Sequence, residues 1–172
     1  MAGSSPPRPE VSVDPVESLR RSPLLREFTD VGIRILAGAM SRRSVGRGTY
    51  LFRSGEPATA LSIIAHGSVQ LLPREGGAAL GELGPGEALG GFSLLHAAGE
   101  HLLSALAAAD VEVLELTIPA FRRLQKDKPQ ASLKLVLAVA ADLGERLQDA
   151  RIPLREFLLW QISKRQAEGP GR

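Results

Sequence analysis

From Arg42 to Thr117 the sequence has the pattern of short strands, with six apolar runs separated by glycine-bearing turns, and this pattern limits the folds that the chain can adopt. The runs are TYLF, ALSIIA, SVQLLP, AALGEL, LLSALAA and VEVLELT. Short strands at such regular intervals favour a small antiparallel barrel or sandwich over a parallel sheet. The REGG stretch at 74–77 is typical of a hairpin, and Gly84-Pro85-Gly86 is typical of a tight turn.

Helical patterns flank the strand region on both sides. Before it, a helical pattern begins at Val16, breaks at Ser22-Pro23 and resumes after Thr29, a suitable N-cap. That second helix is expected to share one face among Val31, Ile35, Leu36 and Met40. After the strands, Thr117 is expected to cap a helix that turns Phe121 and Leu124 inward.

The stretch from Pro129 to Ala150 has the most regular helical pattern in the chain. Apolar residues recur at steps of three and four, at Leu133, Val136, Ala140, Leu143, Leu147 and Ala150, and Leu135, Leu137 and Val139 add a second apolar side. Two apolar faces exceed what packing on one barrel requires, so the pattern predicts a homodimer through this helix. The expected interface comprises Leu133, Val136, Ala140, Leu143, Leu147, Phe157 and Trp160.

The 172 residues, 44% of them hydrophobic, are enough for one domain with one core. We expect a disordered proline-containing tail over 1–15, the domain over 16–152, and a short amphipathic helix and tail over 153–172. No apolar stretch is long enough to span a membrane and the N-terminus does not resemble a secretion signal, so a cytoplasmic location is predicted. Zero cysteines and three scattered histidines predict no metal site and no cofactor.

The stretch GTYLFRSGEPATALSIIAHGSVQLL, from Gly48 to Leu72, resembles the cyclic-nucleotide-binding domain family, which includes the catabolite activator protein and protein kinase A regulatory subunits. The resemblance continues through LGPGEALGGFSLL and VEVLELTIPAFRRL, covering about residues 18–150. It implies a mixed α+β fold: a small antiparallel β-barrel of the double-stranded β-helix or jelly-roll kind, with N-terminal helices and a long C-terminal helix. Gly55 and Gly67 fit turns that require positive φ.

The resemblance also places a ligand site on the second motif, where family members carry Gly-Glu-Leu/Ile-Ala and, about ten residues later, Arg-Ser/Thr-Ala. Gly90 matches the family's glycine, but Gly91 stands in place of the glutamate and is followed by Phe92 and Ser93. His101, Leu102 and Leu103 occupy the Arg-Ser/Thr-Ala positions. These seven residues form the candidate site, in a degenerate form.

No Lys or Arg occurs from Glu75 to Phe121, while seven Asp and Glu residues do. The family's arginine is therefore missing, and a shifted alignment does not restore it. Loss of the arginine and glutamate contacts predicts that cAMP and cGMP are not bound. Two alternatives stay open: Gly90-Gly91 presents helix N-terminal amides to another anion, or the apolar residues line a pocket for an apolar ligand.

The residues indicate no catalytic motif, so the chain is predicted not to be an enzyme. Only about 20 residues follow Arg151, too few for a helix-turn-helix domain, so no DNA partner and no membrane span are expected. The predicted function is a non-catalytic regulatory or scaffold module that acts through protein–protein contacts with unknown partners. The alternative is a small-ligand sensor that binds a cyclic nucleotide or another small molecule in the remodelled pocket.

Overall fold

Strands β3 (Ala60–His66) and β8 (Val111–Thr117) form the centre of the fold, because both faces of each strand are covered. They pair antiparallel, and β1 (Ser41–Val45) and β6 (Ala88–Leu89) flank them in the order β1-β8-β3-β6. Along β8, Leu114 and Leu116 pack with the helices, while Val111 and Val113 pack on the opposite side. Burial on both sides accounts for the uninterrupted apolar runs within these strands, Ile63 to Ala65 in β3 and Val113-Leu114 in β8.

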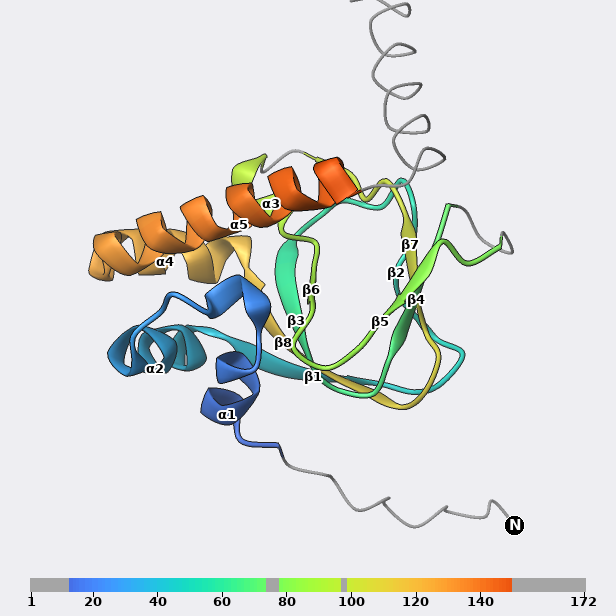
Figure 1. Cartoon of the computed structure of the whole chain (residues 1–172), viewed down its shortest axis with the longest axis horizontal. Coiled ribbons are helices and arrows are strands. Elements are labelled where there is room, and N and C mark those ends of the chain that lie inside the picture. The colour runs from blue at the N-terminus through green and yellow to red at the C-terminus, as the bar shows by residue number, and fades with distance from the viewer. Residues whose placement is uncertain (1–12, 74–77, 97–98, 150–172) are drawn as a thin grey trace, which may run out of the picture.

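The computed structural model describes residues 13–73, 78–96 and 99–149 of the 172. A second antiparallel sheet, in the order β2-β7-β4-β5, faces the first (Figure 1). Its strands are β2 (Tyr50–Phe52), β7 (Ser104–Ala107), β4 (Val69–Leu72) and β5 (Gly81–Leu83). The predicted mixed α+β jelly-roll is confirmed, although the two sheets of the described chain do not close into one barrel.

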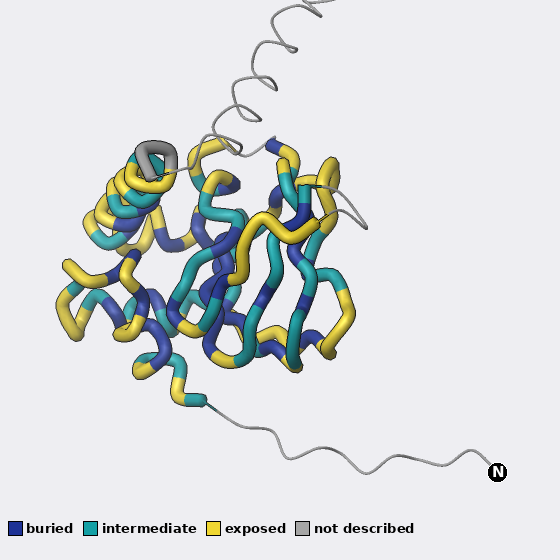
Figure 2. The backbone as a smooth tube through the Cα atoms, turned by 45° about the vertical axis from the view of Figure 1, so that its right-hand side comes forward, coloured by how far each residue is buried: buried dark blue, intermediate teal, exposed yellow. Residues whose placement is uncertain are grey.

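The buried side chains form two clusters on the two sides of the β1-β8-β3-β6 sheet. Figure 2 shows buried backbone segments in dark blue within the strands and the helical layer. The cluster between the sheets contains Val45, Leu51, Ile64, Val69, Leu83, Leu89, Ala105, Ala107, Val111 and Val113. The other cluster joins the same sheet to the helices and includes Leu61, Ile63 and Leu114 with Leu36 and Leu135. One sheet therefore supplies a wall to both cores.

Three short helices precede the strands: α1 (Pro15–Arg20), the 3-10 helix η1 (Pro23–Leu25) and α2 (Asp30–Ala39). The predicted N-cap of α2 is confirmed, because the Thr29 hydroxyl accepts a hydrogen bond from the Gly32 amide at 3.3 Å. Of the four residues expected to share a face, Leu36 is buried and Ile35 and Met40 pack against the core, but Val31 is 65% exposed. Ile33 and Leu36 instead face the core, because the sheet meets α2 on that side.

Helices α4 (Ile118–Asp127) and α5 (Pro129–Asp149) follow the last strand and lie on the helical side of the sheet (Figure 1). The Thr117 hydroxyl accepts from the Ala120 amide and caps α4, and Phe121 and Leu124 are buried, as predicted. None of the described helices is both long and apolar enough to cross a bilayer.

The apolar residues of α5 are divided between two sides of the helix. Leu135 and Val139 are buried in the helical core, and Val136 and Leu143 pack against it. Of the predicted seam, Leu133 and Ala140 are exposed, whereas Val136 and Leu143 are half-buried. The Leu147 side chain, Phe157, Trp160 and the predicted tail and last helix lie outside the described residues, so the expected interface stays a prediction.

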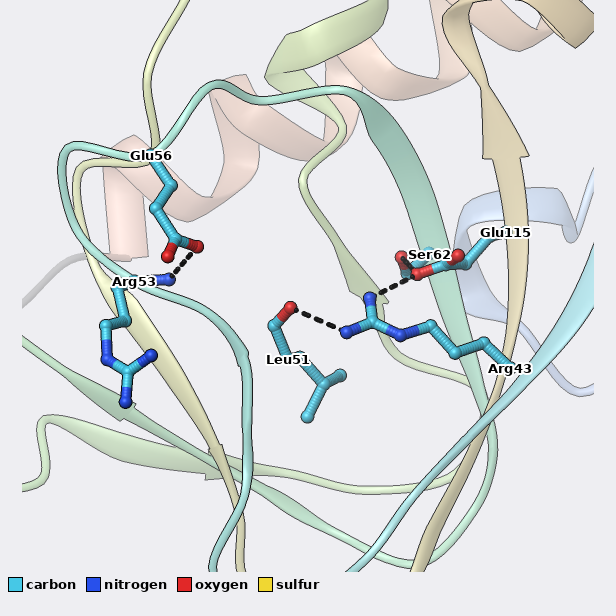
Figure 3. A network of polar contacts seen from close by, with 6 residues as sticks. All are labelled: Arg43, Leu51, Arg53, Glu56, Ser62 and Glu115. Carbon is cyan, nitrogen blue, oxygen red and sulfur yellow. Dashed lines mark hydrogen bonds and ion pairs between the residues drawn. The ribbon is translucent and has the colours of Figure 1, made fainter.

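Two strands were not foreseen, β1 and β6, and β1 has the sequence SRRSV. Arg43 lies on the same side of β1 as buried Val45, in alternate positions along the strand. Its guanidinium donates to Glu115 Oε1 at 3.0 Å and to the Leu51 carbonyl oxygen at 3.1 Å (Figure 3). Because Leu51 belongs to β2, Arg43 forms a hydrogen bond between the two sheets.

The predicted turn at Gly84-Pro85-Gly86 is confirmed, with the Glu87 amide donating to the Gly84 carbonyl at 3.2 Å. Gly86 has φ of 92°, and a Cβ there would lie 2.8 Å from the Arg21 carbonyl oxygen. Gly55 and Gly67 also have positive φ, 86° and 83°, as expected. The REGG hairpin lies outside the described residues.

Candidate functional site

A cavity of about 190 Å³ lies where strand β6, the segment after it, residues 100–103 and helix α5 converge. Four of its lining residues carry ionisable side chains: Glu100, His101, Asp142 and Arg146. The other lining residues are apolar or glycine: Leu24, Phe52, Ala58, Leu61, Leu71, Leu83, Ala88, Leu89, Gly90, Gly91, Phe92, Leu102, Leu103, Val139 and Leu143. A concave, mostly apolar wall with a few polar groups is typical of a small-molecule site.

Gly90 and Gly91 form one wall of the cavity and are held there by close packing. Gly90 has φ of 69°, and a Cβ added to it would lie 2.5 Å from the Ala60 carbonyl oxygen. A Cβ on Gly91 would lie 3.1 Å from Val139 Cγ1 on α5. At Gly90 the backbone therefore approaches β3 more closely than a residue with a side chain allows, whereas a side chain at Gly91 would require Val139 to shift by a few tenths of an ångström.

The short helix α3 (Phe92–Leu95) starts at this segment and carries the next two predicted residues in different directions. Phe92 lines the cavity, is 47% exposed and meets His96 edge to face at 5.8 Å between ring centroids. Ser93 is buried and does not line the cavity; its Oγ has no hydrogen-bond partner among the described residues.

His101 stacks on an aromatic ring inside the site. Its ring lies 3.6 Å from that of Phe52, measured between centroids, with 7° between the planes. Burial lowers the pKa of His101 below its usual 6.5, and the nearby Glu56 carboxylate only partly opposes this effect. His101 is therefore neutral at pH 7.

Backbone hydrogen bonds tie the His101 segment to the turn at 53–56. The His101 amide donates to the Glu56 carbonyl oxygen, and the Gly55 amide donates to the His101 carbonyl oxygen, both at 2.8 Å. The Glu56 carboxylate in turn accepts from the Arg53 amide at 2.8 Å (Figure 3). The turn built by the first sequence motif thus sets the position of the second.

Leu102 and Leu103 follow His101 along the cavity wall. Leu102 is 40% exposed, and its carbonyl oxygen accepts from the Ser54 hydroxyl at 3.1 Å. Neither side chain can form hydrogen bonds, so at these two positions the cavity offers a ligand only apolar contact.

Helix α5 supplies a wall of the cavity that sequence reasoning missed. Val139, Asp142, Leu143 and Arg146 line it at successive steps of three, one and three residues, which places them on one helical face. Arg146 Nε lies 2.8 Å from Asp142 Oδ2, and its Nη2 donates to the Ala88 carbonyl oxygen at 3.4 Å. The i, i+3, i+4, i+7 spacing was a usable signal, but nothing in the sequence alone shows which face meets the cavity.

Six of the seven predicted site residues line this one cavity, and Ser93 does not. Glu100 is a further lining residue that the motif did not single out. Across residues 13–73, 78–96 and 99–149, no cluster of three or more His, Asp or Glu residues is suited to hold a metal ion.

Residues 42–128 match the model of the cyclic nucleotide-binding domain family. The chain is 32% identical over 139 residues to a cyclic AMP receptor protein from Thermus thermophilus, a match that covers 79% of this chain and 62% of that protein. The crystal structure of the Thermus thermophilus catabolite activator protein superposes with a TM-score of 0.66, at 33% identity over 80% of this chain and 63% of that one. The N-terminal domain of a Streptomyces coelicolor transcriptional regulator gives a TM-score of 0.65, at 28% identity over 78% and 97%.

These similarities correct one prediction made from the sequence. The expectation of no DNA partner is wrong, because the chain is similar to a catabolite activator protein and to the N-terminal domain of a transcriptional regulator. It spans only 62% of the Thermus thermophilus receptor protein, so the number of residues after Arg151 was not a valid basis for that expectation.

Proposed function

The chain belongs to the cyclic nucleotide-binding domain family, and from that premise we propose that it is a non-catalytic regulatory module that does not bind cyclic nucleotides. The observation that carries this proposal is that His101 is uncharged and stacked on Phe52. The family's arginine position is filled by a neutral ring that stacks on Phe52, so it presents no charge to a cyclic phosphate.

The packing at Gly91 supports the same proposal. In cyclic-nucleotide-binding members this position carries a glutamate that accepts from the ribose. Here Val139 Cγ1 would lie 3.1 Å from a Cβ at Gly91, so a glutamate would fit only if the α5 side chain moved. The glutamate that would accept from the ribose is absent, and Val139 lies against the position where its Cβ would be.

The charges around the cavity also disfavour an anion. Glu100 lines the cavity, and the stretch from Glu75 to Phe121 holds seven acidic residues and no Lys or Arg. Arg146, the cation in the lining, is already paired with Asp142. Loss of two charge-assisted hydrogen bonds weakens binding by about 3–6 kcal/mol, roughly a factor of 10² to 10⁴ in affinity.

Isothermal titration calorimetry with cAMP and with cGMP tests this proposal. We expect no heat of binding for either ligand at concentrations up to about 100 µM, because a micromolar site would be weakened to about millimolar. A dissociation constant in the low micromolar range for the wild-type chain would overturn the proposal.

A variant that restores the family motif tests the same proposal by gain of binding. Gly91→Glu, His101→Arg, Leu102→Ser and Leu103→Ala together should raise the affinity for cAMP by at least about tenfold, since two charged contacts return. The matched control replaces His101 by Gln in the same background, which keeps the side-chain size but supplies no charge. Equal affinities of the two variants would show that the cavity no longer has the family's ligand geometry.

We further propose that the module acts through protein–protein contacts. Apolar side chains exposed beside the cavity, Phe92, Leu95 and Leu102, support this, with exposed fractions of 40–47%. The identity of a partner and the cytoplasmic location stay predictions.

A second candidate function is supported by the cavity itself. Its volume of about 190 Å³ and its mainly apolar lining suit a small uncharged molecule. A thermal-shift screen of uncharged aromatic and aliphatic compounds separates the two functions, because a ligand bound to the folded state raises the melting temperature. A concentration-dependent rise would favour a sensor of apolar molecules over a module without a ligand.

A further inference from the structure

Helix α5 has an apolar face that points away from the domain. Leu133 and Leu137 are each 61% exposed, whereas Leu135 and Val139, on the opposite side of the helix, are buried. Ala140 and Ala141 extend the outward face, and a Cβ added at Gly144 would meet nothing within 4 Å.

A groove runs beside this face, between α5 and the segment that contains η1. It has a volume of about 420 Å³. Its apolar lining comprises Pro23, Leu24, Phe28, Leu137, Ala138 and Ala141, and its charged lining comprises Arg26, Glu27, Lys134, Asp142 and Glu145. On α5 the lining from Leu137 to Glu145 spans about 12 Å, at 1.5 Å per helical residue.

The chain that continues after α5 matches this groove in length and pattern. Leu154, Phe157, Leu158 and Ile162 repeat at helical spacing, and from Leu154 to Ile162 a helix again spans about 12 Å. Residues 150–153 connect Asp149 to Leu154 and end in a proline. Such a connection is long enough to reverse the chain direction between two antiparallel helices.

The net charges of the two surfaces are opposite in sign. The groove carries three carboxylates and two cations, while residues 151–165 carry four Lys and Arg residues and one Glu. Glu145 is paired with Arg26 and Asp142 with Arg146, so the attraction is modest and the apolar match carries the proposal.

We propose that residues 154–162 dock as a helix in the groove between α5 and residues 23–28, antiparallel to α5 in the same chain. Leu154, Phe157, Leu158 and Ile162 then cover the groove, with Ile162 opposite the turn of α5 that contains Ala141. The groove shares Leu24 and Asp142 with the ligand cavity, but the proposal does not rest on what that cavity binds.

The absence of cysteine from the sequence permits a direct test by disulfide formation. The full chain carrying Ala141→Cys and Ile162→Cys should form an intramolecular disulfide under mild oxidation, at a monomeric mass. The matched control carries Ala141→Cys and Ser163→Cys, because residue 163 is one position further along and on the opposite side of a helix. Docking predicts a rate at least about tenfold higher for the first pair.

Tryptophan fluorescence of single variants provides a second readout, since Trp160 is the only tryptophan in the chain. Leu137→Asp places a charge in the groove and should increase acrylamide quenching of Trp160. Leu133→Asp is the control, because Leu133 is equally exposed on α5 but does not line the groove.

Three results would overturn the proposal. Equal oxidation rates of the two cysteine pairs would show that the segment has no fixed position on α5. Disulfide-linked dimers in place of monomers would show that a second copy occupies this face. Equal quenching in Leu137→Asp and wild type would show that the groove does not hold the segment.

Discussion

Gly90 and Gly55 both have left-handed backbone conformations, but their surroundings differ. A Cβ at Gly90 would lie 2.5 Å from the Ala60 carbonyl oxygen, whereas a Cβ at Gly55 would meet nothing within 4 Å. We expect Gly90→Ala to lower the free energy of unfolding by about 2–4 kcal/mol, because β3 must move in addition to the backbone strain. Gly55→Ala should lower it by only about 1–2 kcal/mol. Urea denaturation of both variants measures the difference, and equal losses would contradict the crowding argument.

The lowered pKa of His101 predicts a pH dependence of stability. Because the unfolded chain has a His pKa near 6.5, the unfolded state binds more protons than the folded state just below that pH. The stabilising contribution of neutral His101 is fully present above about pH 6.5 and is lost as the pH falls toward the lower folded-state pKa. Urea midpoints at several pH values should therefore fall less steeply on acidification for His101→Gln than for wild type.

Proton NMR of the His101 ring provides the direct measurement of its pKa. A value at or above 6.5 in the folded protein would contradict the desolvation argument and would also restore a positive charge near pH 6. That result would weaken the proposal that the cavity rejects anions.

At the scale of elements, two leucines of α5 separate the inward from the outward face. Leu135 is 1% exposed and Leu137, two residues on, is 61% exposed. Leu135→Ala should lower the free energy of unfolding by about 2–5 kcal/mol, because it leaves a cavity in the helical core. Leu137→Ala should change it by about 0.5 kcal/mol, or by somewhat more if the docking proposed above is correct. Chemical denaturation followed by circular dichroism measures both values.

The sequence pattern was sufficient to locate α5 but not to orient it. Leu133, Val136, Ala140 and Leu143 have seam spacing, yet the helix drifts with respect to a seven-residue repeat, and the sheet contacts the side that carries Leu135 and Val139. Which apolar stripe faces inward depends on contacts with distant strands. Local periodicity does not contain that information.

Strand β1 shows a second limit of pattern reasoning. Its sequence SRRSV has one apolar residue, so hydrophobic alternation gives no signal. The strand forms because it pairs with β8 over five registered positions, and because Arg43 donates to Glu115 and to the Leu51 carbonyl oxygen. The Arg43 side chain is 43% exposed, so a search for apolar residues does not detect this strand.

At the scale of the whole molecule, the two cores should unfold together. Both use β3 and β8, so loss of one core removes a wall from the other. We expect Leu135→Ala, in the helical core, and Ile64→Ala, between the sheets, to shift one common transition by about 2–5 kcal/mol each. Hydrogen exchange followed by mass spectrometry across a urea series is the measurement. Separate loss of protection in helices and strands would contradict the shared-sheet argument.

The overall fold and most of the candidate site could be predicted because glycine positions and strand lengths are local properties of the sequence. Six of the seven predicted residues line the cavity, since 90–92 and 101–103 are contiguous segments of its wall. Val139, Asp142 and Arg146 were missed because their contribution depends on how α5 packs across the sheet. The DNA prediction failed for another reason: it relied on the length of chain after α5.

Leu24 and Asp142 line both the cavity and the groove, so α5 and η1 act as a partition between two sites. If a ligand in the cavity moves this shared wall, it changes the affinity of the groove for its occupant, and its own affinity must then change by the same factor. Such a ligand would act as an effector of the outer surface. Conversely, a partner that displaces residues 154–162 would then change the ligand affinity of the cavity without contacting the ligand.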